Sequence, residues 1–443
     1  MSIFKTYDIR GVFDKELTKE NCINISKAIA TYCVKKGFKH ISCGKDARLS
    51  SDFIHQTLLS ELKKAGLIVE NTGLVTTPVF NYSIVALKSD FGVMVTASHN
   101  PKEYNGFKMC TAGPLPIYYE RGISEIEEIY NKAEFCKESA EGKVTKVEII
   151  PSYAKYLSSL FKAKTIPFVA DCSNGPSGIV MDAISDAVGI HPILINKEPD
   201  GNFPGHPPNP LEKENLSQLS EKVKAEKVAF GVCFDGDGDR AFFVDENGEI
   251  IPLDVIFSIL SKHELLKNPG EEIYYDLRFS QTVERAILKY HGVPIKLRVG
   301  NPFYKEKLIK TGGVLAGELS GHIMYAKNYS IDDSIYALLK LLEILKSEKK
   351  PLSELCEEFN NFNKSDEINL KVENPDDIFE RIKSTFSSQR IELIDGISVY
   401  SKDFWFNIRK SNTEPLIRLN LEANSYEILN LKIKELKELI SSS

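Results

Sequence analysis

Short apolar runs alternate with amphipathic segments along most of the chain, and each apolar run ends in a polar turn. Thr18 can cap a first helix and Gly37 can end it. Residues 40–44 and 91–95 have the apolar, β-branched composition of buried strands, and a second helix is expected up to about Lys64. Helices that alternate with strands predict an α/β layer.

The same alternation continues through two further stretches and then changes. A charged segment near residue 150 marks a first boundary, and residues 198–210, with five prolines and two glycines, predict a long, stiff loop. From about Asp366 the order becomes strand, helix, two hairpins and a closing helix, which predicts an α+β unit. We therefore expect domains at residues 1–150, 151–250, 251–365 and 366–443.

Length and composition agree with several soluble domains. A chain of 443 residues exceeds one ordinary core, and 42% hydrophobic with 27% charged residues is typical of globular proteins. The net charge of -6 gives no overall attraction to nucleic acid or to an anionic membrane. Eight cysteines without a CxxC pair argue for reduced thiols, and neither a signal peptide nor an apolar membrane-spanning segment is evident. We expect a cytoplasmic protein without nucleic-acid or membrane partners.

The first candidate site is the loop Thr96-Ala97-Ser98-His99-Asn100-Pro101, which follows the strand at 91–95. It places the Ser98 hydroxyl at a strand tip beside the His99 imidazole, where covalent chemistry is possible. The alternative is an ordinary turn, because serine and asparagine are common in turns. An Asn105-Gly106 tight turn would return Lys108 to the same sheet end, and Arg10 belongs to an extended N-terminal segment.

The second candidate site is Asp235-Gly236-Asp237-Gly238-Asp239-Arg240, between the apolar runs 228–234 and 241–244. Three carboxylates on alternate residues can converge on Mg²⁺. A pair of Asp-Gly hairpin turns is the alternative, but it would leave three anions together without compensation. An EF-hand is excluded, because Arg240 stands where that loop needs glycine and because the flanks read as strands.

Two more polar loops follow predicted strands. Glu318, Ser320 and His322 alternate in Gly317 to His322, where an extended loop would turn all three toward sugar hydroxyls; a capping cluster before a helix is the alternative. The turn from Arg409 to Pro415 combines two cations with small hydrogen-bonding side chains and can clamp a phosphate, unless it is simply a solvated turn. Together the four loops supply the parts that phosphoryl transfer to or from a sugar phosphate requires.

In combination and order these motifs resemble the α-D-phosphohexomutase family, within it the bacterial phosphomannomutase/phosphoglucomutase branch. The resemblance covers nearly the whole chain and rests on these segments: YDIRG (7–11), TASHNP (96–101), NGFK (105–108), DGDGDR (235–240), GELSGH (317–322) and RKSNTEP (409–415). It implies three related α/β domains with mixed sheets and a smaller C-terminal α+β domain around a central cleft. It also implies interconversion of hexose 1-phosphate and hexose 6-phosphate, with mannose and/or glucose as the sugar.

The resemblance assigns roles residue by residue. Ser98 is similar to the serine that holds the transferable phosphoryl group, and it would bind Mg²⁺ together with Asp235, Asp237 and Asp239. Lys108 is similar to the acid/base lysine, and the reacting phosphate would be surrounded by Arg10, His99 and Arg240. Glu318, Ser320 and His322 match the sugar-specificity loop. The distal phosphate would be held by Arg409, Ser411, Asn412 and Thr413.

Two departures concern substrate preference. Arg278 stands where a lysine is expected in a DxKxS-like turn, and Gly300-Asn301 lacks an expected histidine; a planar guanidinium is not equivalent to an ammonium point charge. We include Arg278 among the substrate-binding residues. The implied cofactors are Mg²⁺ and glucose 1,6-bisphosphate or mannose 1,6-bisphosphate, the implied partners are sugar phosphates, and a monomer or weak homodimer is expected.

Three other functions fit parts of this pattern. A phosphoglucosamine mutase shares nearly all the loops, although we would expect glutamine where Leu319 stands. A magnesium-dependent sugar phosphatase would use an aspartate of residues 235–239 as the nucleophile and leave Ser98 idle. A non-catalytic sugar-phosphate-binding protein would bind the ligand without isomerising it.

Overall fold

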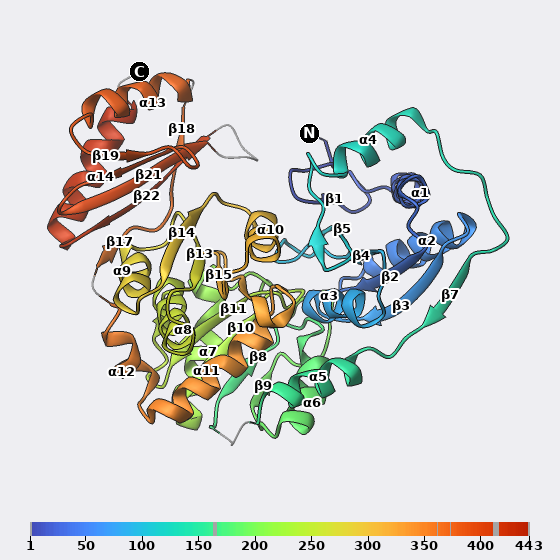
Figure 1. Cartoon of the computed structure of the whole chain (residues 1–443), viewed down its shortest axis with the longest axis horizontal. Coiled ribbons are helices and arrows are strands. Elements are labelled where there is room, and N and C mark those ends of the chain that lie inside the picture. Colours follow the sequence, from blue (N-terminus) through green and yellow to red (C-terminus); the bar gives the residue numbers. More distant parts are fainter. Residues whose placement is uncertain (1, 163–165, 361, 373, 411–415, 442–443) are drawn as a thin grey trace.

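Four β-sheets, each associated with its own helices, form four successive units of the chain (Figure 1). The structure is a computed structural model that describes residues 2–162, 166–360, 362–372, 374–410 and 416–441. The first unit (blue) lies at one end of the molecule, the second and third lie side by side in the middle, and the fourth (red) lies at the other end. The expected fold class is confirmed.

The first unit is built on a mixed seven-stranded sheet. Thr18 caps its first helix by accepting a hydrogen bond from the amide of Asn21, and Gly37 ends that helix in the left-handed conformation. Its strands are β1 (Ile9–Val12), β2 (His40–Lys45), β3 (Ile68–Leu74), β4 (Phe91–Val95), β5 (Tyr104–Thr111), β6 (Leu115–Pro116) and β7 (Lys143–Lys146). Its helices are α1 (Lys19–Lys36), α2 (Ser51–Lys64), α3 (Thr77–Ala86) and α4 (Ile123–Lys132).

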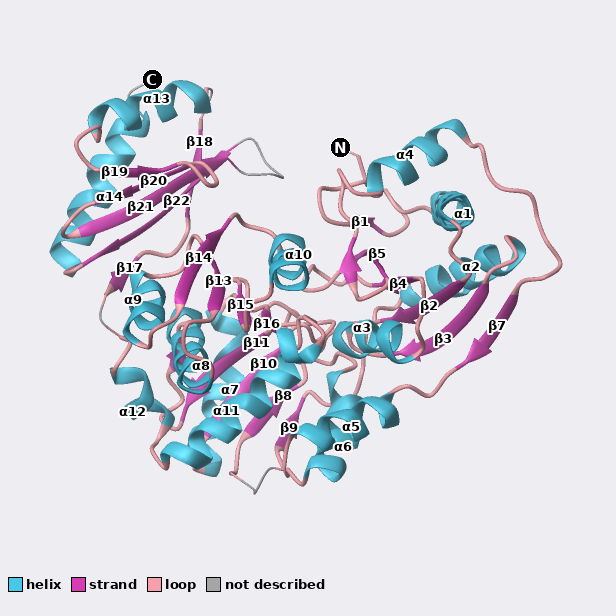
Figure 2. Ribbon diagram, in the orientation of Figure 1, coloured by secondary structure: helices cyan, strands magenta, loops and turns pink. Residues whose placement is uncertain are grey.

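The second and third units have smaller sheets (Figure 2). The second comprises α5 (Ile150–Leu160), β8 (Val169–Asp171), α6 (Ser177–Val188), β9 (Ile193–Ile195), α7 (Ser217–Glu226), β10 (Phe230–Phe234), β11 (Ala241–Asp245) and β12 (Ile250–Ile251). The third comprises α8 (Leu253–Lys267), β13 (Glu272–Asp276), α9 (Gln281–Lys289), β14 (Val293–Leu297), α10 (Asn301–Thr311), β15 (Leu315–Gly317), β16 (Ile323–Tyr325), α11 (Ser334–Glu348) and α12 (Leu352–Glu357). One continuous hydrophobic cluster runs through both units and reaches α3, β4 and β5 of the first, so the second and third units share a core that also packs on the first.

One strand order recurs in the first three units. The strands run β3-β2-β4-β5 in the first, β9-β8-β10-β11 in the second and β14-β13-β15-β16 in the third. In each, the first three strands in chain order are parallel and the fourth is antiparallel to the third. The three units are therefore related, and the loop between the third and fourth strands is equivalent in all of them.

The fourth unit has a different, mostly antiparallel sheet and a separate hydrophobic cluster. Its elements are β17 (Asn363–Lys364), β18 (Ile368–Lys371), α13 (Pro375–Thr385), β19 (Arg390–Glu392), β20 (Ile397–Tyr400), β21 (Phe404–Lys410), β22 (Leu416–Ala423) and α14 (Tyr426–Ser441). The expected α+β order is confirmed. Because this unit has a core of its own, it can move as one body relative to the rest.

Two local predictions were wrong. Asn105-Gly106 is not a turn, because both residues lie inside β5, paired with Gly11 and Arg10 of β1. The sugar-specificity loop is neither extended nor a cap before a helix: the amide of Glu318 donates to the carbonyl of His322 across a tight hairpin from β15 to β16. Within the described residues, no helix is both long and apolar enough to cross a membrane.

Candidate active site

A cavity of about 1140 Å³ is lined by side chains from all four units. The equivalent loops of the first three units face it, because each follows the third strand of its own sheet. Of the predicted site residues, those that line the cavity are Arg10, Ser98, His99, Lys108, Asp239, Arg240, Arg278, Glu318, Ser320 and His322. The fourth unit contributes Arg418 to the wall.

Ser98 lies at the tip of β4, fully buried and in the left-handed conformation, with φ of 52°. Its amide donates to the hydroxyl of Thr96, 2.9 Å away, and its own hydroxyl donates to Oδ2 of Asp235 at 3.0 Å. Nδ1 of His99 is 3.4 Å from the same hydroxyl oxygen. The predicted nucleophile of the first unit thus meets the predicted metal loop of the second.

The three aspartates of the metal loop are completely buried and lie close together. Burial and the carboxylates of Asp239 and Asp237 raise the pKa of Asp235 well above its usual value. Oδ1 of Asp237 and Oδ1 of Asp239 are buried without a hydrogen-bond partner among the described residues. A hard cation would satisfy these oxygens and offset the repulsion, so the residues fit Mg²⁺.

Lys108 lies beside these aspartates, although the turn expected to bring it there does not exist. It belongs to β5, and its Nζ is 2.8 Å from Oδ2 of Asp237 and 2.7 Å from Oδ2 of Asp239. Burial would lower the pKa of Lys108, but the carboxylates of Asp237, Asp239 and Asp235 outweigh burial and raise it. The side chain is therefore a charged ammonium.

Arg10, His99 and Arg240 line the same cavity as Ser98. Arg10 donates to Oδ1 of Asn100 at 2.5 Å and pairs with Asp8. Nε of Arg240 is 3.6 Å from Oδ2 of Asp235. Burial and the positive charges of Arg240 and Arg10 hold the pKa of His99 well below its ordinary range, so its imidazole is neutral.

The third unit places its predicted residues beside the metal loop: His322 forms a β-bridge with Arg240, and its Nδ1 is 3.8 Å from Oδ1 of Asp239. Nη2 of Arg278 is 3.4 Å from Oε1 of Glu318, and burial, the largest effect, raises the pKa of Glu318 to about 7 despite that arginine. Burial, Arg240 and Lys108 lower the pKa of His322 well below its ordinary value. A carboxyl that titrates near neutrality and a neutral imidazole are suited to hydrogen bonds with sugar hydroxyls.

Arg409 lies at the end of β21 and is 3% exposed. It shares the carboxylate of Glu367 with Arg418: Nη2 of Arg409 is 3.0 Å from Oε2, and Nη1 of Arg418 is 3.1 Å from Oε1. Burial and the charge of Arg278 lower the pKa of Arg409. The other predicted clamp residues, Ser411, Asn412 and Thr413, lie outside the described residues.

Sequence reasoning missed several polar residues that the structure places in or next to the site. Lys305 is 3% exposed and lies 2.5 Å from Oδ1 of Asp332, and both line the cavity. Asn301, one of the two noted departures, donates to Oδ2 of the same aspartate at 2.9 Å.

Arg48 donates hydrogen bonds to main-chain carbonyl oxygens of the Ser98 loop. Its pairing with Asp46 is repeated by Arg278 and Asp276, a spacing that comparison of the two units would have found.

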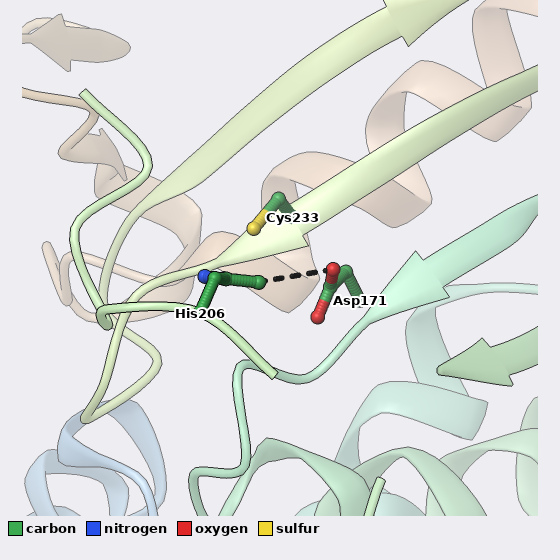
Figure 3. Close-up of side chains that lie close together, drawn as sticks. All are labelled: Asp171, His206 and Cys233. Atoms are coloured by element: carbon green, nitrogen blue, oxygen red, sulfur yellow. Dashed lines mark hydrogen bonds and ion pairs between the residues drawn. The ribbon is translucent and has the colours of Figure 1, made fainter. Parts of the chain in front are cut away.

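A further group of potential ligands lies in the second unit (Figure 3). Donor atoms of Asp171, His206 and Cys233 lie within 4.8 Å of one another. Asp171 also accepts hydrogen bonds from the amide of Ser173 and from Asn196, and Nε2 of His206 is 3.1 Å from its Oδ2. Burial raises the pKa of the Cys233 thiol well above its usual value, so the sulfur keeps its proton. Through the contact of His206 with Asp171, the proline-rich loop of residues 198–210 is attached to strand β8.

Comparisons with known proteins agree along the whole chain. Family models of phosphoglucomutase/phosphomannomutase match α/β/α domain I at residues 1–137, domain II at 150–248, domain III at 253–362 and the C-terminal domain at 367–438. A phosphomannomutase of Methanocaldococcus jannaschii is 38% identical over 446 residues, covering 100% of this chain and 98% of that protein. A phosphomannomutase/phosphoglucomutase of Pseudomonas aeruginosa is 35% identical, covering 97% and 93%. The crystal structure of a phosphoglucomutase/phosphomannomutase family protein from Burkholderia thailandensis has a TM-score of 0.92 at 31% identity, covering 99% and 97%.

Proposed function

The chain belongs to the phosphoglucomutase/phosphomannomutase family, and from this we propose that the protein interconverts hexose 1-phosphate and hexose 6-phosphate through a phosphoryl group carried by Ser98. The sugar is mannose, glucose or both. The observation that carries the proposal is the contact of 3.0 Å between the hydroxyl of Ser98 and Asp235, at a cavity to which all four units contribute.

In the proposed reaction, phosphorylated Ser98 gives its phosphoryl group to a free hydroxyl of the bound sugar phosphate. The bond between phosphorus and Oγ of Ser98 breaks, a bond from phosphorus to the sugar oxygen forms, and a hexose 1,6-bisphosphate results. The sugar hydroxyl loses a proton and Oγ of Ser98 gains one. We assign both transfers to Lys108, which is charged: its ammonium gives a proton to the departing Oγ and is recharged by the proton of the sugar hydroxyl. The bisphosphate then turns over and returns its other phosphoryl group to Ser98.

Ser98, Asp235, Asp237 and Asp239 are the proposed Mg²⁺ ligands. When bound, this ion would offset the negative charge that accumulates on the phosphoryl group. Arg10, His99 and Arg240 would surround that group, since each lies on the cavity wall near Ser98. Glucose 1,6-bisphosphate or mannose 1,6-bisphosphate is the proposed intermediate and activator.

Glu318, Ser320 and His322, on the hairpin next to the metal loop, would bind the sugar hydroxyls. Arg278 and Arg409 would bind the distal phosphate, and the fourth unit would close over the substrate as one body. The side chain of Leu319 packs against the hydrophobic core, so it offers no polar group to a sugar amine. This supports mannose and glucose over glucosamine. We further propose a cytoplasmic monomer or weak homodimer, to be checked by light scattering.

The test is conversion of hexose 1-phosphate to 6-phosphate by wild-type protein and Ser98→Ala, primed with glucose 1,6-bisphosphate. We expect one added phosphoryl group in the intact mass of the wild type and none in Ser98→Ala, which should not turn over. Near-normal turnover by Ser98→Ala would refute the role of the serine. Release of inorganic phosphate in place of 6-phosphate would indicate a phosphatase, and binding without conversion would indicate a binding protein. Competition among mannose, glucose and glucosamine 1-phosphates identifies the sugar.

A further inference from the structure

We infer that Arg48 is a positioning residue that holds the Ser98 loop in the conformation needed for phosphoryl transfer. This inference rests on the proposed role of Ser98. Arg48 follows β2, does not line the cavity with the predicted site residues, and is only 2% exposed. It would therefore act through the loop rather than on the substrate.

The guanidinium of Arg48 is saturated with contacts to the loop and its flanks. Nη2 donates to the carbonyl oxygens of Ser98 at 2.8 Å and Asn100 at 2.6 Å. Nη1 donates to the carbonyl oxygens of Pro101 at 2.6 Å and Tyr104 at 3.0 Å. Nε is 3.1 Å from Oδ2 of Asp46. All five N–H donors of the side chain are used, four of them on backbone oxygens at or next to the nucleophile.

Ser98 needs such a restraint because its backbone is in an unfavourable region. A non-glycine residue with φ of 52° has an intrinsic cost, and such residues persist only where the surroundings determine them. The four carbonyl oxygens can approach one another only if hydrogen-bond donors compensate their partial negative charges. The planar guanidinium of Arg48 supplies these donors. Because Arg48 fixes the loop, the Ser98 hydroxyl is directed toward Asp235.

The repeated topology shows that this contact is part of a pattern. Each α/β unit has an aspartate at the end of its first parallel strand or directly after it. The carboxylate of this aspartate accepts a hydrogen bond from the main-chain amide of the residue two positions later: Arg48 donates to Asp46, Ser173 to Asp171 and Arg278 to Asp276. In each unit the same turn also binds either the loop after the third strand or the last residue of that strand. The contacts are Arg48 to the Ser98 carbonyl, Ser173 to the Phe234 carbonyl at 2.5 Å, and the amide of Leu319 to Asp276 at 3.0 Å.

This recurrence argues that the first-strand turn sets the position of the active-site loop in all three units. The first unit carries the most extensive version: Arg48 makes four contacts, whereas Ser173 makes one and the turn of the third unit makes two, through Asp276 and Arg278. A merely stabilising role would instead predict that activity falls only as far as the folded fraction does. The positioning role and the merely stabilising role therefore predict different values of kcat for the folded enzyme.

The experiment compares Arg48→Ala and Arg48→Lys with the wild type, using glucose 1-phosphate, Mg²⁺ and glucose 1,6-bisphosphate. We expect kcat to fall about 100-fold in Arg48→Ala, the size of effect that a displacement of about 1 Å produces. KM should change less than about threefold, because the distal phosphate clamp is not altered. Arg48→Lys should recover little, since one ammonium cannot reach four diverging oxygens. Millimolar guanidinium should partly restore kcat of Arg48→Ala, and methylammonium should not.

His55→Ala is the matched control. His55 is 1% exposed in α2 of the same unit and is hydrogen-bonded to Asn71, away from the Ser98 loop. It should lower the melting temperature while leaving kcat of the folded enzyme unchanged. If Arg48→Ala does not fold, Arg48→Lys carries the test, with kcat reduced and KM retained as the supporting result.

Failure of this inference is distinguishable from failure of the proposed function. If Ser98→Ala is inactive but folded Arg48→Lys and Arg48→Ala turn over at the wild-type rate, the positioning role is overturned and the role of Ser98 stands. If Ser98→Ala is active, the proposed function fails first. A drop in kcat for Arg48→Ala no larger than that for His55→Ala at matched stability would also overturn the inference.

Discussion

Oγ of Ser98 lies 3.0 Å from Oδ2 of Asp235, although 137 residues separate the two in the chain. The contact exists because the loops after β4 and β10 are equivalent in their units and meet at one cavity. It joins a hydroxyl that can bear a phosphoryl group to a carboxylate cluster that fits a cation. Among the described residues, Oδ1 of Asp237 and Oδ1 of Asp239 have no hydrogen-bond partner, so this cluster should respond measurably to a metal ion.

Removal of divalent metal should abolish turnover and lower the melting temperature. Mg²⁺ binds only the folded protein, so saturation at about 100 times the dissociation constant should add about 2.7 kcal/mol to the free energy of unfolding. Asp237→Asn should lose this increment, because it withdraws a buried ligand charge. Scanning calorimetry with EDTA and with Mg²⁺ measures the difference.

A surface carboxylate of the same unit provides the control for the metal experiment. Glu226 pairs with Lys222 on exposed α7, so Glu226→Gln should keep the full response to Mg²⁺. An equal response of Asp237→Asn and Glu226→Gln would show that the ion binds elsewhere.

Replacement of Lys108 should separate catalysis from stability. Lys108→Ala removes the proton donor, and we expect turnover to fall about 100-fold or more. Without metal it also removes the ion pairs of Lys108 with Asp237 and Asp239, although Asp239 keeps Arg240 at 3.8 Å, at a cost of about 3 kcal/mol. Mg²⁺ should restore much of the stability and little of the activity. Recovery of both would mean that Lys108 serves only to balance charge.

The sequence predicted the parts of the site better than it predicted how they come together. Ser98, the three aspartates and Glu318 stand out because polar residues interrupt apolar strands. Lys108 was expected near Ser98 for the wrong reason: Asn105-Gly106 lies in β5, since pairing with β1 on one side and β4 on the other overrides the turn preference of that dipeptide. The N-terminal strand that supplies this pairing is too short for its partner to be deduced from pattern alone.

Arg48 and Lys305 illustrate what composition and spacing do not reveal. Both are cations in stretches without a distinctive motif, and burial gives them their importance. The partners of Arg48 are main-chain carbonyl groups. Because every residue has one, no pattern of side chains predicts these contacts. The repeat of Asp-x-Arg at residues 46–48 and 276–278 was a weak clue, because residues 8–10 have the same spacing; the repeat becomes informative once the units are known to be related.

The pKa of Glu318 near 7 predicts a pH-dependent affinity for the sugar. Above pH 7 the buried carboxyl is ionised and accepts stronger hydrogen bonds from hydroxyl groups, so KM should fall as pH rises from about 6 to 8. Glu318→Gln cannot ionise and should show a flat profile, apart from ionisation of the substrate phosphate, which affects both proteins equally. Identical profiles for the two would exclude this carboxyl as the titrating group.

The same shift has a consequence for stability with a definite sign. The folded-state pKa of about 7 exceeds the usual value of 4.5, so between these values the folded chain holds a proton that the unfolded chain has released. The free energy of unfolding should therefore fall as pH rises through this window. Glu318→Gln should remove this component, which denaturant titrations at pH 5 and pH 7.5 can measure. A larger loss of stability in the variant would contradict the assignment.

Glu367 holds Arg409 and Arg418 in one cluster. If Arg409 binds the distal phosphate, Arg409→Ala should raise KM by about 10- to 100-fold, the range expected for loss of a hydrogen bond to a charged group. Arg390→Ala is the control: that side chain is 62% exposed and pairs with Glu392 on the same unit, so KM should not change. Glu367→Gln frees both arginines from their carboxylate, and by releasing their charge for the substrate it should lower KM. If KM stays at the wild-type value in Arg409→Ala, the phosphate is held by other groups of the cavity, with Arg278 and Arg418 next to be replaced.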